Sequence, residues 1–340
     1  MVLRAPREIV AGDVPKPSSG SRDAVVRVTH SGICGTDYKI YSGAIPVSYP
    51  RVMGHEMTGE VVDAGGAGAV KAGERVIVDP QLYCGTCFHC SIGQTHLCPK
   101  GMLIGRDING GFAEFVAAPA SHVFRLPDSI DARTAPLIQV LTTCLHAQQQ
   151  IDIRPGEAVV VFGLGVTGQL HVQLAKAAGA RPVIGVTRSA DKRALAEKLG
   201  ADVTMAGEDA AIAKVREITG GRGADVVIET TGMLPSLSSG IHMARSGGRL
   251  LLFGIFTAKE GALPFYDLYF KELSLIGARV ARSEDYPAAI ALVERGAVRL
   301  DPLVSDVMPL GELDAAVAML GSDSGSRMKV ILDHGSGVRG

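Results

Sequence analysis

The sequence A-V-V-V-F-G-L-G-V-T-G-Q-L-H-V-Q-L-A-K-A-A, Ala158–Ala178, decides the fold class. A run of β-branched residues ends at Phe162, glycines follow at G-x-G-x-x-G spacing, and Leu170, Leu174 and Ala178 then recur on one helical face. This pattern predicts a buried strand, a tight turn and an amphipathic helix. A glycine motif alone is a weak signal, because glycines also end strands for structural reasons. Since a predicted strand precedes this glycine motif and a predicted helix follows it, the stretch favours dinucleotide binding.

Each glycine of the motif has a separate role. Gly163 permits the turn, Gly165 lets the backbone approach a pyrophosphate, and Gly168 lets the helix pack closely on the strand. Val166 opens the helix, whose N-terminus faces the phosphates. We therefore expect all four residues to bind the cofactor.

The chain around this stretch alternates short apolar runs with helical patterns. The sequence predicts strands at 158–162, 182–187, 225–229 and 249–254, with helices between them. Such alternation is typical of an α/β fold with a doubly wound parallel sheet.

Bulk properties exclude several classes of function. The chain has 340 residues, enough for two domains, and a net charge of −1 without a basic block, which argues against a nucleic-acid partner. No apolar run reaches membrane-spanning length, and charges and prolines occupy the place where a signal peptide would need an apolar core. We therefore expect no membrane partner and a cytoplasmic location.

A group of four cysteines predicts a metal site. Cys84, Cys87, Cys90 and Cys98 follow the spacing C-x2-C-x2-C-x7-C. Four thiolates on one short loop fit a closed tetrahedral zinc site, which leaves no open position for a substrate and is therefore structural. An iron–sulfur cluster is the competing interpretation, but the fourth cysteine comes too late for the ferredoxin pattern.

Two earlier motifs supply further zinc ligands, G-I-C-G-T-D at 32–37 and G-H-E-M at 54–57. In this order, with the cysteine lobe and G-L-G-V-T-G, they resemble the zinc-dependent medium-chain dehydrogenases over nearly the whole chain. That family contains alcohol, polyol, threonine and glucose dehydrogenases. The resemblance implies a Rossmann domain, residues 150–280, inserted in a GroES-like β-barrel catalytic domain made of residues 1–149 and 281–340, with a structural zinc lobe at 80–104.

The resemblance also implies a catalytic zinc site. Cys34 and His55 match the usual zinc ligands, and Glu56 matches an acidic residue that either binds the metal or lies just behind it. Thr36 matches the hydroxyl residue that passes the substrate proton, and Asp37 matches the carboxylate that orients the ligand histidine. We expect two Zn²⁺ ions per chain.

Two positions of this comparison have open interpretations. Gln139 stands where relatives often have Glu, Asp or Cys as the last ligand, so it binds the catalytic zinc weakly or through water. Lys329 matches a basic residue that reaches the cofactor in some relatives, and a plain surface lysine is the alternative.

The end of the second strand decides the cofactor. Thr187 stands where NAD-dependent relatives have an aspartate that binds the ribose 2′-hydroxyl, and Arg188, Ser189 and Lys192 follow it. No carboxylate here repels a 2′-phosphate, and a guanidinium can bind one. The sequence therefore favours NADP over NAD, although a basic helix start merely solvated by water is the alternative.

Further segments resemble known parts of the cofactor domain. Thr230 and Thr231 resemble the cofactor-lining turn, and Phe253 lies in the strand that presents backbone to the nicotinamide. The segment 266–278 resembles an edge strand used for pairing in homodimers or homotetramers.

Together these features predict a zinc-dependent oxidoreductase that interconverts a secondary alcohol and its carbonyl with NADP(H). A polyol, sugar or small alcohol is the first expectation for the substrate. The alternatives are an NAD-dependent, threonine-type amino-alcohol dehydrogenase and a non-catalytic NADP-binding relative with a weakened metal site. A zinc-free reductase of the same fold would lack Cys34, His55 and the cysteine lobe.

Overall fold

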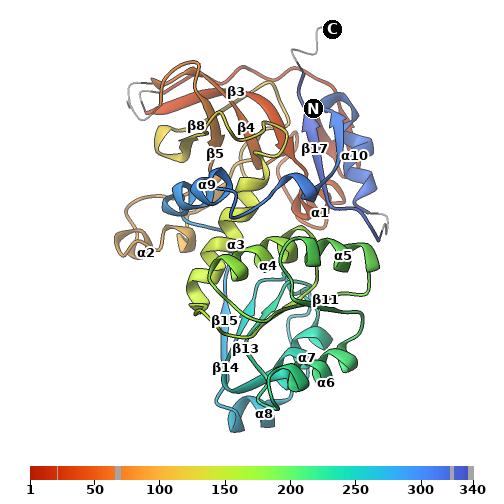
Figure 1. Cartoon of the computed structure of the whole chain (residues 1–340). Helices are drawn as coiled ribbons and strands as arrows, with labels where there is room; N and C mark the ends of the chain where they lie inside the picture. The colour runs from red at the N-terminus through yellow and green to blue at the C-terminus, as the bar shows by residue number, and fades with distance from the viewer. Residues whose placement is uncertain (21, 66–69, 322–324, 336–340) are drawn as a thin grey trace. The chain divides into compact units, whose positions relative to one another are not determined.

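The computed structural model describes residues 1–20, 22–65, 70–321 and 325–335 (Figure 1). The chain divides into two compact units. Unit 1 comprises Met1–Thr142, Ala281–Glu294 and Leu303–Gly340, and unit 2 comprises Thr143–Val280 and Arg295–Pro302. Within the described ranges, no helix has both the length and the apolar sequence needed to cross a membrane.

Unit 2 contains a six-stranded parallel sheet in the order β12-β11-β10-β13-β14-β15. Its strands are β10 (Val159–Phe162), β11 (Val183–Val186), β12 (Val203–Met205), β13 (Ala224–Glu229), β14 (Ala244–Leu252) and β15 (Ser274–Gly277). Its helices are α4 (Val166–Ala177), α5 (Ala190–Lys198), α6 (Glu208–Ile218), α7 (Leu234–Met243) and α8 (Phe265–Phe270). The predicted doubly wound α/β fold is confirmed, and each of the four predicted strands overlaps a strand of this sheet.

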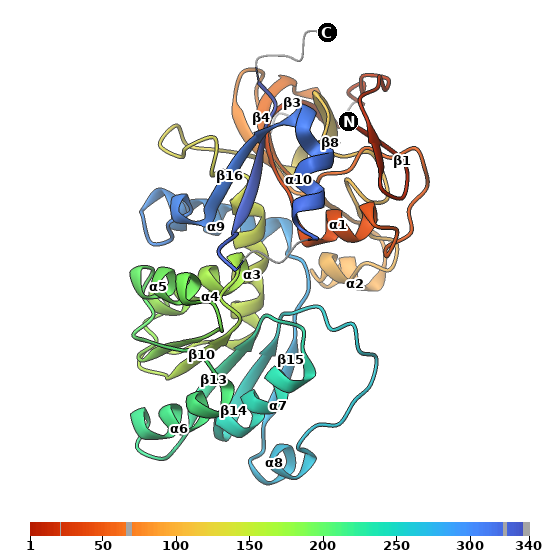
Figure 2. The same ribbon diagram turned by 90° about the vertical axis from the view of Figure 1, so that its right-hand side faces the viewer.

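The apolar side chains of β10 pack on both faces of this sheet. Val159 and Val161 pack in one cluster with residues of α4 and α5. Val160 and Phe162 pack in a second cluster with residues of α6 and α7, so helices cover both faces (Figure 2). A strand buried on both sides is continuously apolar, which explains the run V-V-V-F.

Helix α4 differs from the predicted amphipathic helix. It is buried all round from Gly168 to Ala175, whereas Ala178, expected on the apolar face, is half-buried at the helix end. Its buried polar side chains form internal hydrogen bonds. Gln173 donates to the carbonyl of Arg299 at 3.1 Å and accepts from its N–H at 2.7 Å.

The two hydrogen bonds between Gln173 and Arg299 affect where the domain boundary lies. They tie the segment Arg295–Pro302 to unit 2, whereas the sequence assigned this segment to the catalytic domain. The expected boundary at residue 150 lies inside α3 (Leu137–Ile151), which the two units share, and the expected boundary at 281 coincides with Ala281.

The expected edge strand over 266–278 is only partly a strand. Residues Phe265–Phe270 form α8, and within the segment 266–278 the part that pairs with β14 is Ser274–Gly277. A parallel strand requires a crossover from the end of its neighbour, and α8 lies within that crossover. Strand β15 nevertheless ends the sheet, as expected of an edge strand.

Unit 1 contains a sheet in the order β16-β17-β3-β4-β5-β9, with β8 also paired to β3. The strands of unit 1 are β1 (Val2–Ala5), β2 (Glu8–Val10), β3 (Asp23–Gly32), β4 (Glu56–Asp63), β5 (Arg75–Val78), β6 (Gln81–Leu82), β7 (Met102–Leu103), β8 (Phe115–Pro119), β9 (Val123–Arg125), β16 (Val304–Pro309) and β17 (Lys329–Asp333), of which β1 pairs with β2 and β6 with β7 in two separate sheets. Its helices are α1 (Gly35–Tyr41), α2 (Phe88–Ser91), α9 (Tyr286–Glu294) and α10 (Leu313–Met319), with the first part of α3. Strand β17 pairs with both β16 and β3, which brings the end of the chain beside its beginning.

Candidate metal and cofactor sites

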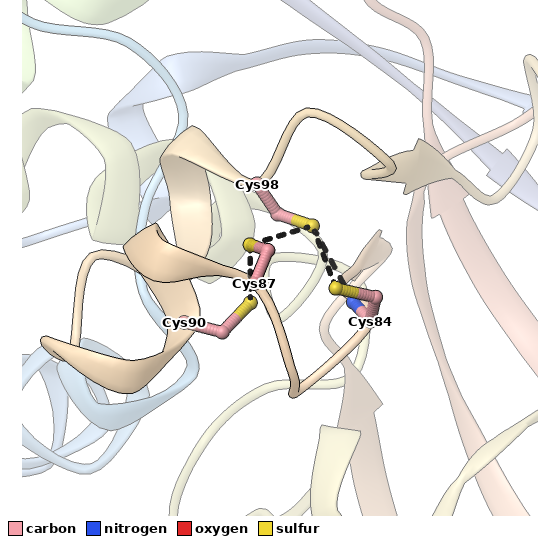
Figure 3. Close-up of side chains that lie close together, drawn as sticks. All are labelled: Cys84, Cys87, Cys90 and Cys98. Atoms are coloured by element: carbon pink, nitrogen blue, oxygen red, sulfur yellow. Dashed lines mark hydrogen bonds between the residues drawn. The ribbon is translucent and has the colours of Figure 1, made fainter.

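The four cysteines of the lobe lie together. Their sulfur atoms are within 4.8 Å of one another, and the separations are 3.5 Å for Cys87–Cys90, 3.6 Å for Cys84–Cys98 and 3.8 Å for Cys87–Cys98 (Figure 3). Four sulfurs at zinc–sulfur bond length around a tetrahedral ion are about 3.8 Å apart. The lobe therefore has the geometry and donor chemistry to hold a structural zinc.

The thiols of this lobe differ in acidity. Hydrogen bonds from the backbone and side chain of Thr86 lower the pKa of Cys84 to about 6. Desolvation and the neighbouring Cys87 raise the pKa of Cys90 to about 11. Four crowded thiolates repel one another, so a cation is needed to hold all four in the ionised form that binds metal.

A second group of donors combines Cys34, His55 and Glu56, whose ligand atoms also lie within 4.8 Å of one another. Strand pairing brings them together. Cys34 follows β3 and caps α1, Glu56 begins β4, and the antiparallel register places Gly32 opposite Glu56. Thiolate, imidazole and carboxylate are all zinc ligands, so these residues fit the expected catalytic metal.

Asp37 is fully buried and contacts two residues of this metal site, Cys34 and His55. Its Oδ2 accepts a 2.8 Å hydrogen bond from the N–H of Cys34, and its Oδ1 lies 3.4 Å from Nδ1 of His55. Burial alone would lower the pKa of His55, but Asp37 and, to a smaller extent, Cys34 raise this pKa well above its ordinary value. Asp37 therefore lies where a carboxylate can orient His55, and Thr36 is half-buried beside it in the first turn of α1.

Lys329 is not a surface lysine. Its Nζ lies 2.8 Å from both carboxylate oxygens of Glu56 and donates to the carbonyl of Ile33 at 3.1 Å. Burial would lower the pKa of this ammonium, but Glu56 raises it. With His55 neutral, as a metal ligand must be, ionised Cys34, Glu56 and Asp37 and cationic Lys329 leave two net negative charges, which match one divalent cation.

Gln139, expected as a weak further ligand, lies half-buried in the first turn of α3. Its role as a ligand stays a prediction. The sequence did not predict the pairing of Lys329 with Glu56, because these residues are 273 positions apart.

The glycine-rich turn has the shape that dinucleotide binding requires. Gly163 has φ +80°, and a Cβ on Gly168 would lie 1.8 Å from the carbonyl oxygen of Gly163, so only glycine fits at Gly168. A Cβ on Gly165 would meet nothing within 4 Å. Gly165 caps α4 without a side-chain hydrogen bond, so the amides of the first turn, from Val166 onward, are open to an anion.

The end of β11 carries the residues expected to select the cofactor. Thr187 and Ser189 are half-buried, Arg188 is exposed, and Ser189 caps α5 by accepting a 3.4 Å hydrogen bond from the N–H of Lys192. The sequence did not single out Arg193 as a residue that shapes this loop. Its guanidinium donates to the carbonyls of Thr187 at 2.9 Å and Arg188 at 2.8 Å.

Comparisons with known proteins agree with this description. Residues 20–128 match the alcohol dehydrogenase GroES-like domain, and residues 166–295 match the zinc-binding dehydrogenase family. The chain is 32% identical to the sorbitol dehydrogenase of Halalkalibacterium halodurans, covering 94% of this chain and 93% of that protein. It is 35% identical to the L-threonine 3-dehydrogenase of Pyrococcus abyssi, covering 88% of this chain and 87% of that protein.

The chain belongs to the zinc-dependent medium-chain dehydrogenases. A solved structure of this dehydrogenase family, a zinc-binding dehydrogenase from Sinorhizobium meliloti bound to NADP, superimposes with a TM-score of 0.91 at 33% identity and covers 98% of both chains. The predicted family and the combination of a Rossmann sheet with a GroES-like domain are therefore confirmed, and this medium-chain dehydrogenase is an oxidoreductase of the alcohol dehydrogenase type.

Proposed function

We propose that this dehydrogenase interconverts a secondary alcohol and its carbonyl with NADP(H). A polyol, sugar or small alcohol is the proposed substrate. The observation that carries the proposal is the group of half-buried Cys34 with buried His55 and Glu56, contacted by Asp37 and Lys329. A zinc ion held by these residues would supply Lewis-acid polarisation of an alcohol oxygen, and the nicotinamide would exchange the hydride.

The residues around the metal ligands have separate tasks in this proposal. Asp37 keeps Nδ1 of His55 directed toward its own carboxylate, which leaves the other imidazole nitrogen for the metal. Lys329 fixes Glu56 through two 2.8 Å contacts and reduces the net negative charge of the pocket. Thr36 would relay the alcohol proton: during oxidation its Oγ1 would take this proton as the hydroxyl gives its own proton to solvent, and carbonyl reduction would run the relay in reverse.

We propose NADP as the cofactor and zinc at both metal sites. The exposed guanidinium of Arg188 and the hydroxyls of Thr187 and Ser189 can bind a 2′-phosphate, and the NADP bound by the Sinorhizobium meliloti relative supports the choice. Thr230, Thr231 and Phe253 would line the nicotinamide half of the site. The sulfur separations support zinc rather than an iron–sulfur cluster in the cysteine lobe.

We also propose that the chain forms homodimers or homotetramers through the edge of the unit 2 sheet, and that it acts in the cytoplasm. Among the described residues, strand β15 pairs only with β14. Helix α8 exposes Phe265, Tyr266, Tyr269 and Phe270 by 63–77%. A two-fold axis at this edge would pair β15 with its copy and cover these aromatic rings. Leu275→Lys should then yield monomers in light-scattering measurements, and unchanged assembly would reject this interface.

One experiment tests the main proposal. NADPH formation is measured across a panel of polyols, sugars, small alcohols and L-threonine, with and without a strong chelator, in the wild-type protein and in Cys34→Ser. We expect turnover of a polyol or sugar that both chelation and the substitution abolish, while the fold and NADP binding remain. Turnover of threonine with NAD would favour the amino-alcohol alternative, which the Pyrococcus abyssi relative supports. Activity retained in Cys34→Ser would reject the role of zinc.

A further inference from the structure

Glu229 is a buried carboxylate that the proposed mechanism does not use. It is the last residue of β13 and only 1% exposed. Its Oε1 accepts hydrogen bonds from the N–H of Thr231, at 2.7 Å, and from the Thr231 hydroxyl. Its Oε2 accepts from the N–H of Gly232 at 2.9 Å, so both oxygens act as acceptors, the pattern of an ionised carboxylate.

The place of Glu229 in the sheet is that of the nucleotide crevice. In the parallel register Glu229 lies opposite Phe162 of β10 and Leu252 of β14. Strands β10 and β13 meet where the strand order reverses, and dinucleotides bind outside the carboxyl ends of the strands at such a point. The second half of the sheet, which begins with β13, corresponds to the nicotinamide mononucleotide.

The backbone around Glu229 joins the turns that would surround the cofactor. Its carbonyl accepts from the N–H of Phe253 at 3.0 Å and of Gly254 at 2.9 Å. The hydroxyl of the next residue, Thr230, donates to the carbonyls of Phe162 at 2.7 Å and Gly163 at 3.0 Å. The Glu229 turn is therefore fixed to the glycine-rich turn on one side and to the end of β14 on the other.

The contacts of the Glu229 carboxylate are hydrogen bonds from neutral donors. Among the described residues, none forms an ion pair with this carboxylate, and its donors are two amides and a hydroxyl. A neutral acceptor could hold this turn equally well, so the turn alone does not require a charged side chain. Burying a charge without a cation is costly. A cation that arrives with the ligand would remove this cost, and the oxidised nicotinamide ring carries a positive charge that the reduced ring lacks.

We propose that Glu229 makes the nucleotide site bind the oxidised nicotinamide cofactor in preference to the reduced one, in addition to holding the turn at Thr231 and Gly232. This inference rests on the proposed use of a nicotinamide cofactor. Because the carboxylate attracts the charged oxidised ring and not the neutral reduced ring, it strengthens binding of NADP⁺ and leaves the binding of NADPH largely unchanged.

Calorimetry of the whole protein with NADP⁺ and with NADPH tests the inference, and it suits a chain without tryptophan. In Glu229→Gln, we expect the dissociation constant of NADP⁺ to rise about tenfold more than that of NADPH. This is the effect that losing one charge would have at an assumed separation of roughly 10 Å and an effective dielectric constant of about 20. Thr231→Val is the matched control, because it removes a hydrogen bond to Glu229 and keeps the charge. Both dissociation constants should rise equally there.

The outcomes distinguish an effect of the Glu229 charge from an effect of the hydrogen bonds that hold the turn. Equal weakening of the two forms in Glu229→Gln overturns the inference, and so does a change of the ratio in Thr231→Val as large as that in Glu229→Gln. If Glu229→Gln does not fold, Glu229→Asp replaces it. The aspartate keeps the charge, so a ratio within about twofold of wild type supports the inference and a tenfold change overturns it. Wild-type protein that binds neither NAD nor NADP would reject the proposed function itself, whereas binding with an unaltered ratio rejects only the role of Glu229.

Discussion

Replacing Lys329 by methionine should destabilise the metal-free protein strongly. Lys329 is 5% exposed and Glu56 is fully buried, and the ammonium lies 2.8 Å from both carboxylate oxygens. Lys329→Met removes the cation, keeps most of the side-chain volume and leaves the Glu56 carboxylate buried without its partner. Breaking a buried pair in this way costs about 3–5 kcal/mol. We expect the Tm of the chelated protein to fall by roughly 5–15 °C.

Zinc and a second substitution provide the controls for this prediction. With zinc present, Glu56 has another cation nearby, so the decrease in Tm should be smaller than in the chelated protein. Lys329→Met combined with Glu56→Gln removes the buried charge, and the double variant should recover most of the loss. Thermal unfolding of the wild type, Lys329→Met, Glu56→Gln and the double variant, each with zinc and with a chelator, measures both effects. A single variant that loses less than about 1 kcal/mol, or a double variant without recovery, would refute the assignment of an ion pair that balances the metal site.

The remaining predictions concern the cofactor, the zinc lobe and a buried acid. Arg188→Ala should raise the dissociation constant of NADP more than about tenfold and leave that of NAD within about twofold, and an equal loss in binding assays would remove the argument for NADP. Cys87→Ser should lower the zinc content measured by mass spectrometry by one ion per chain and lower the Tm, whereas an unchanged zinc content would contradict a closed four-sulfur site. Burial raises the pKa of Asp79 from its ordinary value of 3.8 to about 6. The folded state therefore binds a proton more tightly than the unfolded state, and stability should fall by roughly 3 kcal/mol as the pH rises from about 4 to above 6. Denaturation at several pH values should show this slope in wild type and a flatter profile in Asp79→Asn.

The features that the sequence predicted correctly depend on short-range geometry. The strand, turn and helix around Gly163 and Gly168 follow from residues within one βα unit, and the clash of 1.8 Å that excludes a side chain at Gly168 involves a residue five positions away. The cysteine lobe is similar, because Cys84 to Cys98 lie on one loop. Spacing along the chain is sufficient in such cases because the chain has few ways to connect the residues.

The features that it missed depend on tertiary contacts. Phe265–Phe270 contains aromatic residues that favour strands, yet the crossover between β14 and β15 places them in a helix. The sequence does not signal that the polar side chains of α4 are buried, because the hydrogen bonds of Gln173 are made with Arg299, 126 residues later. A sequence pattern that assigns polar residues to the surface therefore fails where a distant segment supplies the hydrogen bonds.

The metal site shows why the end of the chain belongs to the same unit as its beginning. Strand β3 pairs on one side with β4 and on the other with β17, with Gly32 opposite both Glu56 and Ile331. This register brings Lys329, two residues before Ile331, beside Glu56 and Ile33. A unit 1 that lacked β17 would retain Cys34, His55 and Glu56, but it would bury the charges of Cys34, Asp37 and Glu56 without the ammonium. The cofactor domain can interrupt unit 1 in sequence because the sheet restores the pairing of its two ends, and the charge balance of the metal site depends on that pairing.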